Sequence, residues 1–271
     1  MRRPLVYAHR GGAALKPENT IAAFDHGLGL GADGLEFDVH LSRDGVVVVH
    51  HDNTVDRTTN GRGAVRHLTA AELAHLDAGY WFQPEGDRDE GLGGPNGNYP
   101  CRGAVGGVPA LRDVLRRYPD VPVIIELKVN DSELARRTID ELRATHSVER
   151  AALGSFYYRV LRAARDYEPT IRTGAAREET RWALYRSWVQ WPLGRPAYHE
   201  FQVPERSGRT TIVTPRFIEH ATRSGLPVKV WTINEAADME RLLRWGASAL
   251  ISDRPDIAVA VRAKFVDGGS P

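Results

Sequence analysis

The sequence predicts an α/β protein built as a TIM-type (β/α)8 barrel, for three reasons. Short apolar segments with the character of strands alternate with helical segments, as in a parallel β/α fold, and they lie near residues 5, 35, 123, 151, 171, 199, 228 and 249. A length of 271 residues suits one barrel domain. Polar side chains recur where these strands end, and barrel enzymes build their sites there. A doubly wound open sheet is the alternative fold.

The first unit consists of a strand at residues 5–9 and a helix that begins at residue 21. The strand ends in His9-Arg10-Gly11-Gly12, where the glycines allow a sharp turn or a close approach to a ligand. Asn19 or Thr20 is expected to cap the helix, because either side chain can accept a backbone N–H. The next strand, at residues 34–41, completes a β/α/β series.

This second strand is predicted to form a hairpin and to carry ionisable groups. Asp44-Gly45 is a strong turn signal, and a β-branched run returns through residues 46–49. Glu36 and Asp38 share one face of the strand because they are two residues apart, and the return arm ends in His50-His51, level with them. Two carboxylates suit Ca²⁺ or Mg²⁺, and an imidazole moves protons near neutral pH. A surface hairpin with solvated charges is the alternative.

Residues 79–107 interrupt the β/α pattern. They are rich in glycine and proline, include an acidic run at residues 85–90 and show no sustained period. A long segment without secondary structure inside a compact domain is usually functional or flexible. We therefore expect one domain over residues 1–271, with 79–107 as a short Gly/Pro-rich insertion over the active-site face. An ordinary surface loop is the alternative.

The remaining units follow in order. A buried strand at residues 121–129 carries Glu126 and Lys128 two residues apart, which places an acid and a base on one face. Gly225 and Gly246 are helix stop signals. The expected helices of this part lie at residues 109–118, 132–146, 157–167, 178–191, 216–224 and 235–245, with a closing helix after Pro255.

Composition excludes several classes of protein. A net charge of +1 gives no bulk electrostatic reason to bind nucleic acid or an anionic membrane. Cys101 is the single cysteine, so there is no intrachain disulfide and no cysteine-based zinc site. The N-terminal apolar run is too short for a signal peptide, and no stretch approaches the roughly 20 apolar residues of a transmembrane helix. We expect a soluble, cytoplasmic protein that is a monomer or a homodimer.

Taken together, the motifs resemble those of the glycerophosphodiester phosphodiesterases over roughly residues 5 to 260. Each motif is weak alone, but the ordered set is specific: His9-Arg10-Gly11, Glu18-Asn19-Thr20, Glu36-Phe37-Asp38-Val39, His51-Asp52 with Arg57-Thr58-Thr59, Glu126-Leu127-Lys128, Trp231-Thr232-Ile233-Asn234 and Ser252-Asp253-Arg254-Pro255. The resemblance implies a TIM barrel that hydrolyses glycerophosphodiesters to an alcohol and glycerol 3-phosphate. The chain departs from the family in its short insertion and in Ser252, where the family often has threonine.

The resemblance also implies roles for individual residues. One divalent cation, Mg²⁺ or Ca²⁺, would be held by the carboxylates of Glu36, Asp38 and Glu126. His9 and His51 would form the acid/base pair. The side chains of Arg10 and Lys128 would contact the phosphate. For Lys128 a salt bridge to a neighbouring carboxylate is the alternative. Further candidate substrate contacts are Asn19, Trp231 and Phe156, with helix capping or core packing as the alternatives.

Two other functions fit the same residues. One is cleavage of lysophospholipids in the manner of a phospholipase D, which would need an apolar trench. The other is a barrel that binds phosphodiesters without catalysis. For the hydrolase we expect attack by the glycerol 2-hydroxyl, through a cyclic phosphate that water then opens.

Residues 181–201 are dense in aromatic side chains, namely Trp182, Tyr185, Trp188, Trp191, Tyr198 and Phe201. We favour packing of a helix against the barrel as their role. A membrane-edge surface or a subunit contact is the alternative, because Trp and Tyr suit such boundaries.

Overall fold

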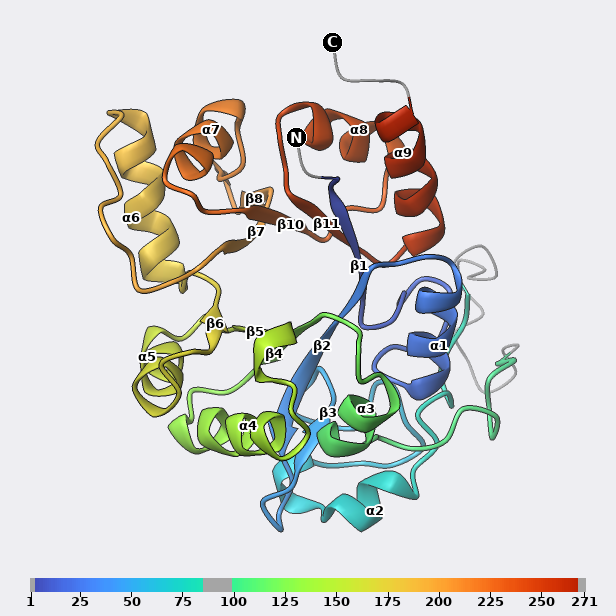
Figure 1. The fold of residues 1–271 in the computed structure, drawn as a ribbon. Coiled ribbons are helices and arrows are strands. Elements are labelled where there is room, and N and C mark those ends of the chain that lie inside the picture. Colours follow the sequence, from blue (N-terminus) through green and yellow to red (C-terminus); the bar gives the residue numbers. More distant parts are fainter. Residues whose placement is uncertain (1–2, 85–98, 268–271) are drawn as a thin grey trace.

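The computed structural model describes residues 3–84 and 99–267, and in this part of the chain eight parallel strands curl into a barrel with helices outside (Figure 1). The strands lie in the order β6-β5-β4-β2-β1-β11-β10-β7. All the predicted strands are found, as β1 (Leu5–His9), β2 (Gly34–Leu41), β4 (Val123–Leu127), β5 (Ala151–Gly154), β6 (Arg172–Thr173), β7 (Phe201–Pro204), β10 (Val228–Trp231) and β11 (Ala249–Ser252). The predicted TIM-type fold is confirmed.

The barrel closes between β6 and β7. Gly174 and Glu200 form a parallel bridge. The N–H of His199 donates to the carbonyl of Thr173 at 2.9 Å, and the N–H of Ala175 donates to the carbonyl of Glu200 at 2.9 Å. These bonds make the barrel a closed one, so the alternative of an open doubly wound sheet is wrong.

The helices lie on the outer side of the barrel (Figure 1). Thr20 caps the first of them, since its Oγ1 accepts the N–H of Ala23 at 3.1 Å, and Thr69 and Glu72 form a capping box on the second. The helices are α1 (Ile21–Gly29), α2 (Ala70–Ala74), α3 (Leu111–Arg117), α4 (Ser132–Ala144), α5 (Tyr158–Tyr167), α6 (Arg177–Trp188), α7 (Pro215–Arg223), α8 (Ala236–Arg244) and α9 (Pro255–Asp267), with 3-10 turns at Val65–His67 and Val148–Arg150.

The predicted hairpin is also present. β3 (Val47–Val49) pairs antiparallel with β2, with Val39 opposite Val49. The N–H of His50 donates to the carbonyl of Asp38 at 2.9 Å, so the histidine pair does return level with the acids. A second, shorter hairpin of β8 (Arg206–Ser207) and β9 (Thr210–Thr211) was not expected from the sequence.

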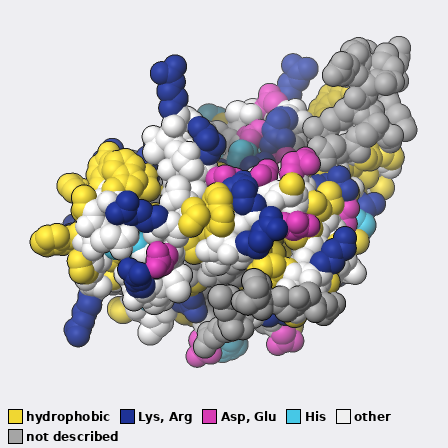
Figure 2. All heavy atoms as spheres, turned by 90° about the horizontal axis from the view of Figure 1, so that it is seen from above, with side chains coloured by type: hydrophobic (Ala, Val, Ile, Leu, Met, Phe, Trp, Pro, Cys, Tyr) yellow, Lys and Arg dark blue, Asp and Glu magenta, His cyan; other side chains and the backbone are white. Residues whose placement is uncertain are grey.

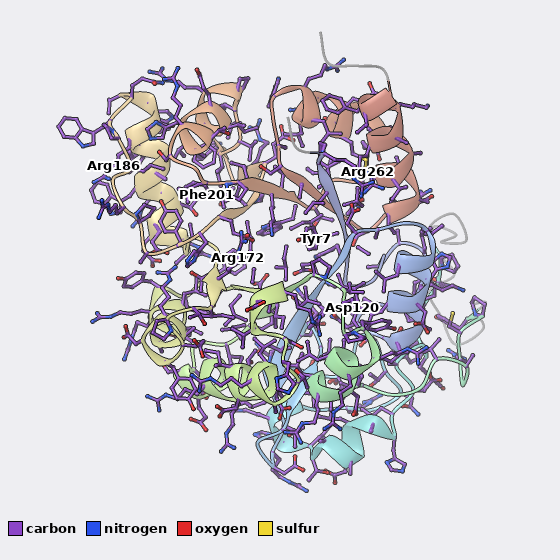
Figure 3. All side chains as sticks on the ribbon, viewed as in Figure 1. Tyr7, Asp120, Arg172, Arg186, Phe201 and Arg262 are labelled. Atoms are coloured by element: carbon purple, nitrogen blue, oxygen red, sulfur yellow. The ribbon has the colours of Figure 1, made fainter. Side chains whose placement is uncertain are left out.

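Alternation along the strands separates the core from the site. On β2, Leu35 and Phe37 are fully buried among the core residues, and the Phe37 ring lies 5.5 Å from that of Phe24 in α1. A second apolar cluster includes Phe201 (Figure 3). The centroid of its ring lies 5.0 Å from that of Phe217 in α7. Since alternate residues of a strand face opposite sides, packing of these side chains on the helices turns Glu36 and Asp38 to the barrel interior.

The barrel interior also holds a buried ion pair away from these acids. Lys229 on β10 lies with its Nζ 2.8 Å from Oε1 of Glu200, whose side chain has no exposed surface. The same ammonium donates to the hydroxyl of Tyr7 at 3.4 Å, and the partly exposed Arg172 approaches the carboxylate at 3.4 Å. Buried charges need such partners, because an unpaired one costs several kcal/mol.

The aromatic segment does not pack as we favoured. Tyr198 and Phe201 are buried, but Trp182 is 64% exposed, Trp188 52% and Trp191 64%. Helix-to-barrel packing is therefore wrong for the tryptophans of this segment. None of the helices in the described residues is both long enough and apolar enough to cross a bilayer.

Most of the predicted insertion, residues 85–98, lies outside the described residues. In its flanks, the guanidinium of Arg102 lies 4.2 Å from the ring centroid of Tyr80 and 4.0 Å from that of Tyr99. These flanks do not line the cavity described below. The placement of the insertion over the active-site face therefore stays a prediction.

The buried ion pair can be tested by its removal. Lys229→Met leaves the Glu200 carboxylate buried without its nearest cation, which we expect to lower the free energy of unfolding by about 3–5 kcal/mol. The double variant Lys229→Met/Glu200→Gln should recover much of that loss, since no unpaired charge remains. Urea denaturation of both variants measures this. A single variant as stable as the wild type would contradict the pairing.

Candidate active site

Three carboxylates meet at the carboxyl ends of adjacent strands. Glu36 and Asp38 come from β2 and Glu126 from β4, where parallel pairing sets Asp38 beside Glu126. One oxygen from each carboxylate lies within 4.8 Å of the others. The acids predicted from separate motifs are thus brought together within reach of a single cation.

Close approach of these three buried carboxylates is electrostatically unfavourable. Oε2 of Glu36 is buried and has no hydrogen-bond partner. Burial raises the pKa of Glu36 to about 8, and the neighbouring Asp38 and Glu126 add to the rise while His9 opposes it. Burial likewise raises the pKa of Glu126. An oxygen-rich, buried and undersatisfied donor set fits a hard divalent cation such as Mg²⁺ or Ca²⁺.

Two cationic side chains flank Asp38. Nζ of Lys128 lies 3.4 Å from Asp38 Oδ1 and 3.5 Å from Glu126 Oε1, and Nε of Arg10 lies 3.2 Å from Asp38 Oδ2. Burial alone would raise the pKa of Asp38, but Arg10 and Lys128 outweigh it and hold that pKa below its usual value. Lys128 therefore makes the salt bridge that was the alternative to its phosphate contact, at a position from which it also lines the cavity.

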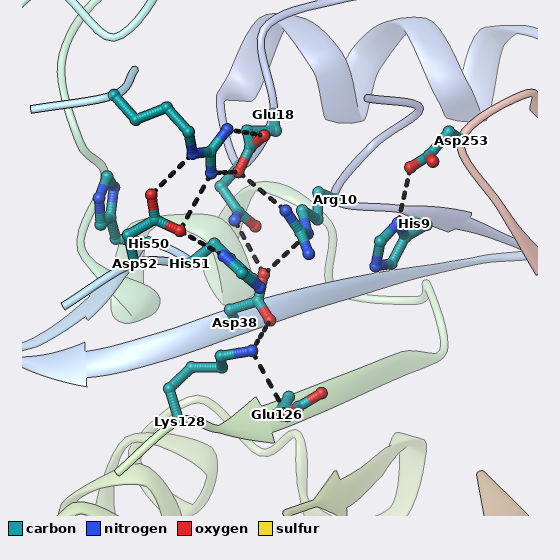
Figure 4. Close-up of polar contacts among 12 residues, drawn as sticks. His9, Arg10, Glu18, Asp38, His50, His51, Asp52, Glu126, Lys128 and Asp253 are labelled. Carbon is teal, nitrogen blue, oxygen red and sulfur yellow. Dashed lines mark hydrogen bonds and ion pairs between the residues drawn. The ribbon is translucent and has the colours of Figure 1, made fainter. Parts of the chain in front are cut away.

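His9 is fixed by a carboxylate behind it. Its Nδ1 donates to Oδ1 of Asp253 at 2.6 Å (Figure 4). Asn234 donates to the other oxygen of Asp253 at 3.0 Å. Its Nε2 is turned toward the acids, 3.7 Å from Glu36 Oε2. Burial lowers the pKa of His9, but Glu36 and Asp253 outweigh it, so the net shift is upward.

His51 is held in the same way from the other side of Asp38 (Figure 4). Its Nδ1 donates to Oδ1 of Asp52 at 2.5 Å, and Arg57 donates to Oδ2 of Asp52 at 2.7 Å. Burial lowers the pKa of His51 despite the nearby Asp38. The two imidazoles thus have pKa values shifted in opposite directions, as in an acid/base pair. The neighbouring His50 contacts the carbonyl of Thr54 and does not line the cavity.

Glu18 connects these groups into one network. It accepts from Arg57 at 2.7 and 2.8 Å and from Arg10 at 3.0 Å. Burial would raise its pKa, but the bond with Arg57 and the charge of Arg10 lower it to about 2. The carboxylate therefore stays charged and fixes both guanidinium groups, one behind His51 and the other beside Asp38.

Backbone strain accompanies this arrangement. Arg10 and Asn19 both have left-handed φ values, +51° and +60°. Such conformations cost about 1–3 kcal/mol each for residues with a side chain and cluster at functional sites. Asn19 is buried and donates to Asp38 Oδ2 at 3.0 Å, so the structure places it behind Asp38 and not on the cavity wall. Its predicted contact with substrate stays a prediction.

A cavity of about 450 Å³ opens from the acids. Phe156 and Trp231 line it with their rings edge to face at 5.9 Å, and the guanidinium of Arg177 lies 5.0 Å from the ring of Phe156. Both aromatic residues lie on the cavity wall, and their contact with a substrate stays a prediction.

Sequence reasoning did not assign the residues that hold the histidines. Asp52, Asp253, Glu18 and Arg57 were all within the quoted motifs, yet only the fold shows what they contact. The His51-Asp52 dipeptide was the usable signal, because a carboxylate next to an imidazole can fix its tautomer.

A parallel barrel with acids, imidazoles and guanidinium groups at the carboxyl ends of its strands has the design of a barrel hydrolase that acts on phosphate esters. The sequence model of the glycerophosphoryl diester phosphodiesterase family matches residues 9–257. The chain belongs to this family and is an enzyme of the phosphoric diester hydrolase class.

The chain is similar in sequence or structure to individual members of the family over nearly its whole length. It is 31% identical to a glycerophosphodiester phosphodiesterase of Caldanaerobacter subterraneus subsp. tengcongensis, over 95% of this chain and 97% of that one. The crystal structure of a glycerophosphodiester phosphodiesterase from Agrobacterium tumefaciens superposes with a TM-score of 0.72 at 28% identity, over 94% and 99% of the two chains. An Oleispira antarctica phosphodiesterase, solved in complex with the product sn-glycerol-3-phosphate, shares the fold with a TM-score of 0.70 at 24% identity, over 95% and 96%.

The acid cluster makes the metal-free fold sensitive to pH. Folding raises the pKa of Glu36 from 4.5 to about 8, so between these values the folded state holds a proton that the unfolded chain releases. Stability then falls as pH rises through that window. We expect the Tm in EDTA to fall between about pH 5 and pH 8 and Mg²⁺ or Ca²⁺ to raise it most at the upper end.

Glu36→Gln is the matched variant for this measurement by differential scanning fluorimetry. Glutamine keeps the shape of the side chain and removes its titration. Both the pH dependence and the metal response should shrink. An unchanged response to both would show that Glu36 does not belong to a cation site.

Proposed function

We propose that the enzyme hydrolyses glycerophosphodiesters to an alcohol and glycerol 3-phosphate, with one divalent cation and two histidines. The observation that carries this is the placement of two carboxylate-backed imidazoles, His9 and His51, on either side of a three-carboxylate cluster. The product-bound structure of the Oleispira relative supports the same product here.

Glu36, Asp38 and Glu126 would hold the cation. When bound, a divalent ion supplies neutralisation of the phosphate charge and a lower pKa for a coordinated hydroxyl. Arg10 and Lys128 stabilise charge that develops on the phosphoryl oxygens, Arg10 through a planar fork and Lys128 as a point charge. Displacement of Lys128 from its contacts with Asp38 and Glu126 frees its ammonium for the phosphate.

The histidines transfer the protons. The glycerol 2-hydroxyl attacks phosphorus as one imidazole accepts its proton, and the other imidazole protonates the leaving alcohol, which gives a cyclic phosphate. Water then opens the ring with the two roles reversed. The lowered pKa of His51 and the raised pKa of His9 suit His51 as the first base and His9 as the first acid.

Replacement of either histidine tests this scheme. We expect His9→Ala and His51→Ala each to lower kcat by about 10²- to 10⁴-fold or more, while the rise in Tm on metal addition is retained. The readout is release of glycerol 3-phosphate from glycerophosphocholine in EDTA, Mg²⁺ and Ca²⁺. His50→Ala is the control and should keep most of its kcat. Normal turnover by either of the first two variants would remove the two-histidine scheme.

A lysophospholipid is a second candidate substrate, because the cavity continues into an apolar trench along α6. The apolar lining residues that define this trench are Leu184, Tyr185 and Trp188 of α6, with Pro204 and Ile212. Arg177, Thr180 and Arg181 of α6 line the same cavity. An acyl chain on the glycerol would bury apolar surface there, at about 25 cal/mol per Å².

The trench predicts a substrate-dependent effect. Trp188→Ala should lower kcat/KM for lysophosphatidylcholine by about tenfold, the equivalent of roughly 55 Å² of lost apolar contact, and should leave kcat/KM for glycerophosphocholine nearly unchanged. Parallel assays of the two substrates measure this. An equal effect on both would mean that the trench takes no acyl chain.

A further inference from the structure

The outer face of α6 carries a row of exposed aromatic side chains, which we call the aromatic ridge: Trp182, Tyr185, Trp188 and, just beyond the helix, Trp191. Tyr185 is 44% exposed and the three tryptophans more so. The rings contact one another, with centroids 6.3 Å apart for Trp182 and Tyr185 and 5.2 Å apart for Tyr185 and Trp188. Val189, at 72% exposure, extends the ridge.

The ridge is a surface and not an incompletely packed core. Thr180, Ala183, Leu184 and Ser187 form the buried side of α6, and this buried side includes none of the ridge residues. A contiguous apolar patch of large rings on a soluble domain usually marks a contact with another surface. Figure 2 shows hydrophobic side chains gathered at the end of the molecule where Figure 1 places α6, with Lys and Arg side chains around them.

Exposed arginines that form no ion pair with any residue the structure describes lie on α6, in the segment that follows it, on the β8–β9 hairpin and at the start of α7. Among the described residues, no ion pair is formed by Arg177, Arg181, Arg195, Arg206, Arg209 or Arg216, and all are exposed. The acids of the same stretch are mostly engaged: Glu179 pairs with Arg165, Glu200 with Lys229 and Glu205 with Arg241, which leaves Glu178 as an exposed acid without an ion pair in the described chain. The ridge is thus strongly basic although the protein as a whole is nearly neutral.

The ridge adjoins the mouth of the active site. Tyr185 and Trp188 belong to the ridge and also line the cavity. Ser207 and Thr210, from the β8–β9 hairpin, line the same cavity, and the hairpin carries Arg206 and Arg209. A flat partner on the ridge would therefore meet the trench and the hairpin arginines together.

We propose that the aromatic ridge and its arginines dock on the surface of an anionic lipid bilayer. Trp and Tyr are the side chains that suit the membrane–water interface, and Arg is attracted to anionic headgroups. A second copy of the chain fits less well, because a two-fold contact sets a patch against itself and would oppose the arginines to one another. Docking in this orientation opens the trench toward the bilayer, where amphiphilic phosphodiesters would be found.

Vesicle co-sedimentation tests the proposal with the full chain. Phosphatidylcholine vesicles with phosphatidylglycerol should bind the protein, and vesicles of phosphatidylcholine alone should bind it much less. Arg206→Gln/Arg209→Gln should lower the partition onto anionic vesicles by about 30-fold, and Trp182→Ala/Trp191→Ala by about tenfold or more. None of these four residues lines the cavity, so turnover of glycerophosphocholine should be unchanged.

Two control variants carry the same kinds of substitution away from the aromatic ridge, so they show whether loss of any exposed ring or arginine weakens vesicle binding. Tyr167→Ala and Arg137→Gln remove an exposed aromatic ring and an exposed arginine from α5 and α4, and they should bind vesicles like the wild type. Equal binding of the wild type to neutral and anionic vesicles, or wild-type binding by the ridge variants, would overturn the proposal. So would a dimer in sedimentation velocity that Trp182→Ala/Trp191→Ala dissociates. Vesicle binding is measured without turnover. A negative result would therefore contradict the docking surface and leave the proposed function untouched, and the reverse holds for the activity assay.

Discussion

The site depends on the cost of gathering three buried carboxylates at one point. Strand pairing forces Glu36, Asp38 and Glu126 together, and burial makes their mutual repulsion expensive. Positive charge must therefore be close by. Arg10, Lys128 and a proton on the Glu36–His9 pair supply part of it, and a divalent cation would supply the rest.

Hydrogen bonds and ion pairs around the three carboxylates fix the orientation of the two catalytic candidates, His9 and His51. Asp253 fixes His9 and Asp52 fixes His51, so each imidazole presents Nε2 away from its anchoring carboxylate. Arg57 holds Asp52, and through Glu18 it is connected to Arg10. Because several contacts hold each of these side chains, the imidazoles stay oriented for proton transfer and the guanidinium of Arg10 for charge stabilisation. No reorganisation is then needed at each turnover.

Much of this was accessible from the sequence because it follows from strand geometry. Residues two apart on a strand share a face, so Glu36 with Asp38 and Glu126 with Lys128 could be placed before any fold was known. Contacts between distant segments could not be predicted in this way. The carboxylate that holds His9, that of Asp253, is 244 residues away in the sequence. The buried pair of Glu200 and Lys229 gave no local signal either. On α6, the large aromatic residues predicted packing against the barrel, but the buried face of this helix carries mostly small side chains, Thr180, Ala183, Leu184 and Ser187. Size and apolarity alone therefore pointed to the wrong face.

The cation site of the three carboxylates can be tested most directly by an anomalous diffraction map of crystals grown with Mn²⁺, which stands in for Mg²⁺ and scatters anomalously. We expect one strong peak with oxygen ligands from Glu36, Asp38 and Glu126, and the ammonium of Lys128 withdrawn from the cluster. A fully loaded crystal with no peak among these three carboxylates, and with Lys128 still between Asp38 and Glu126, would contradict the cation site.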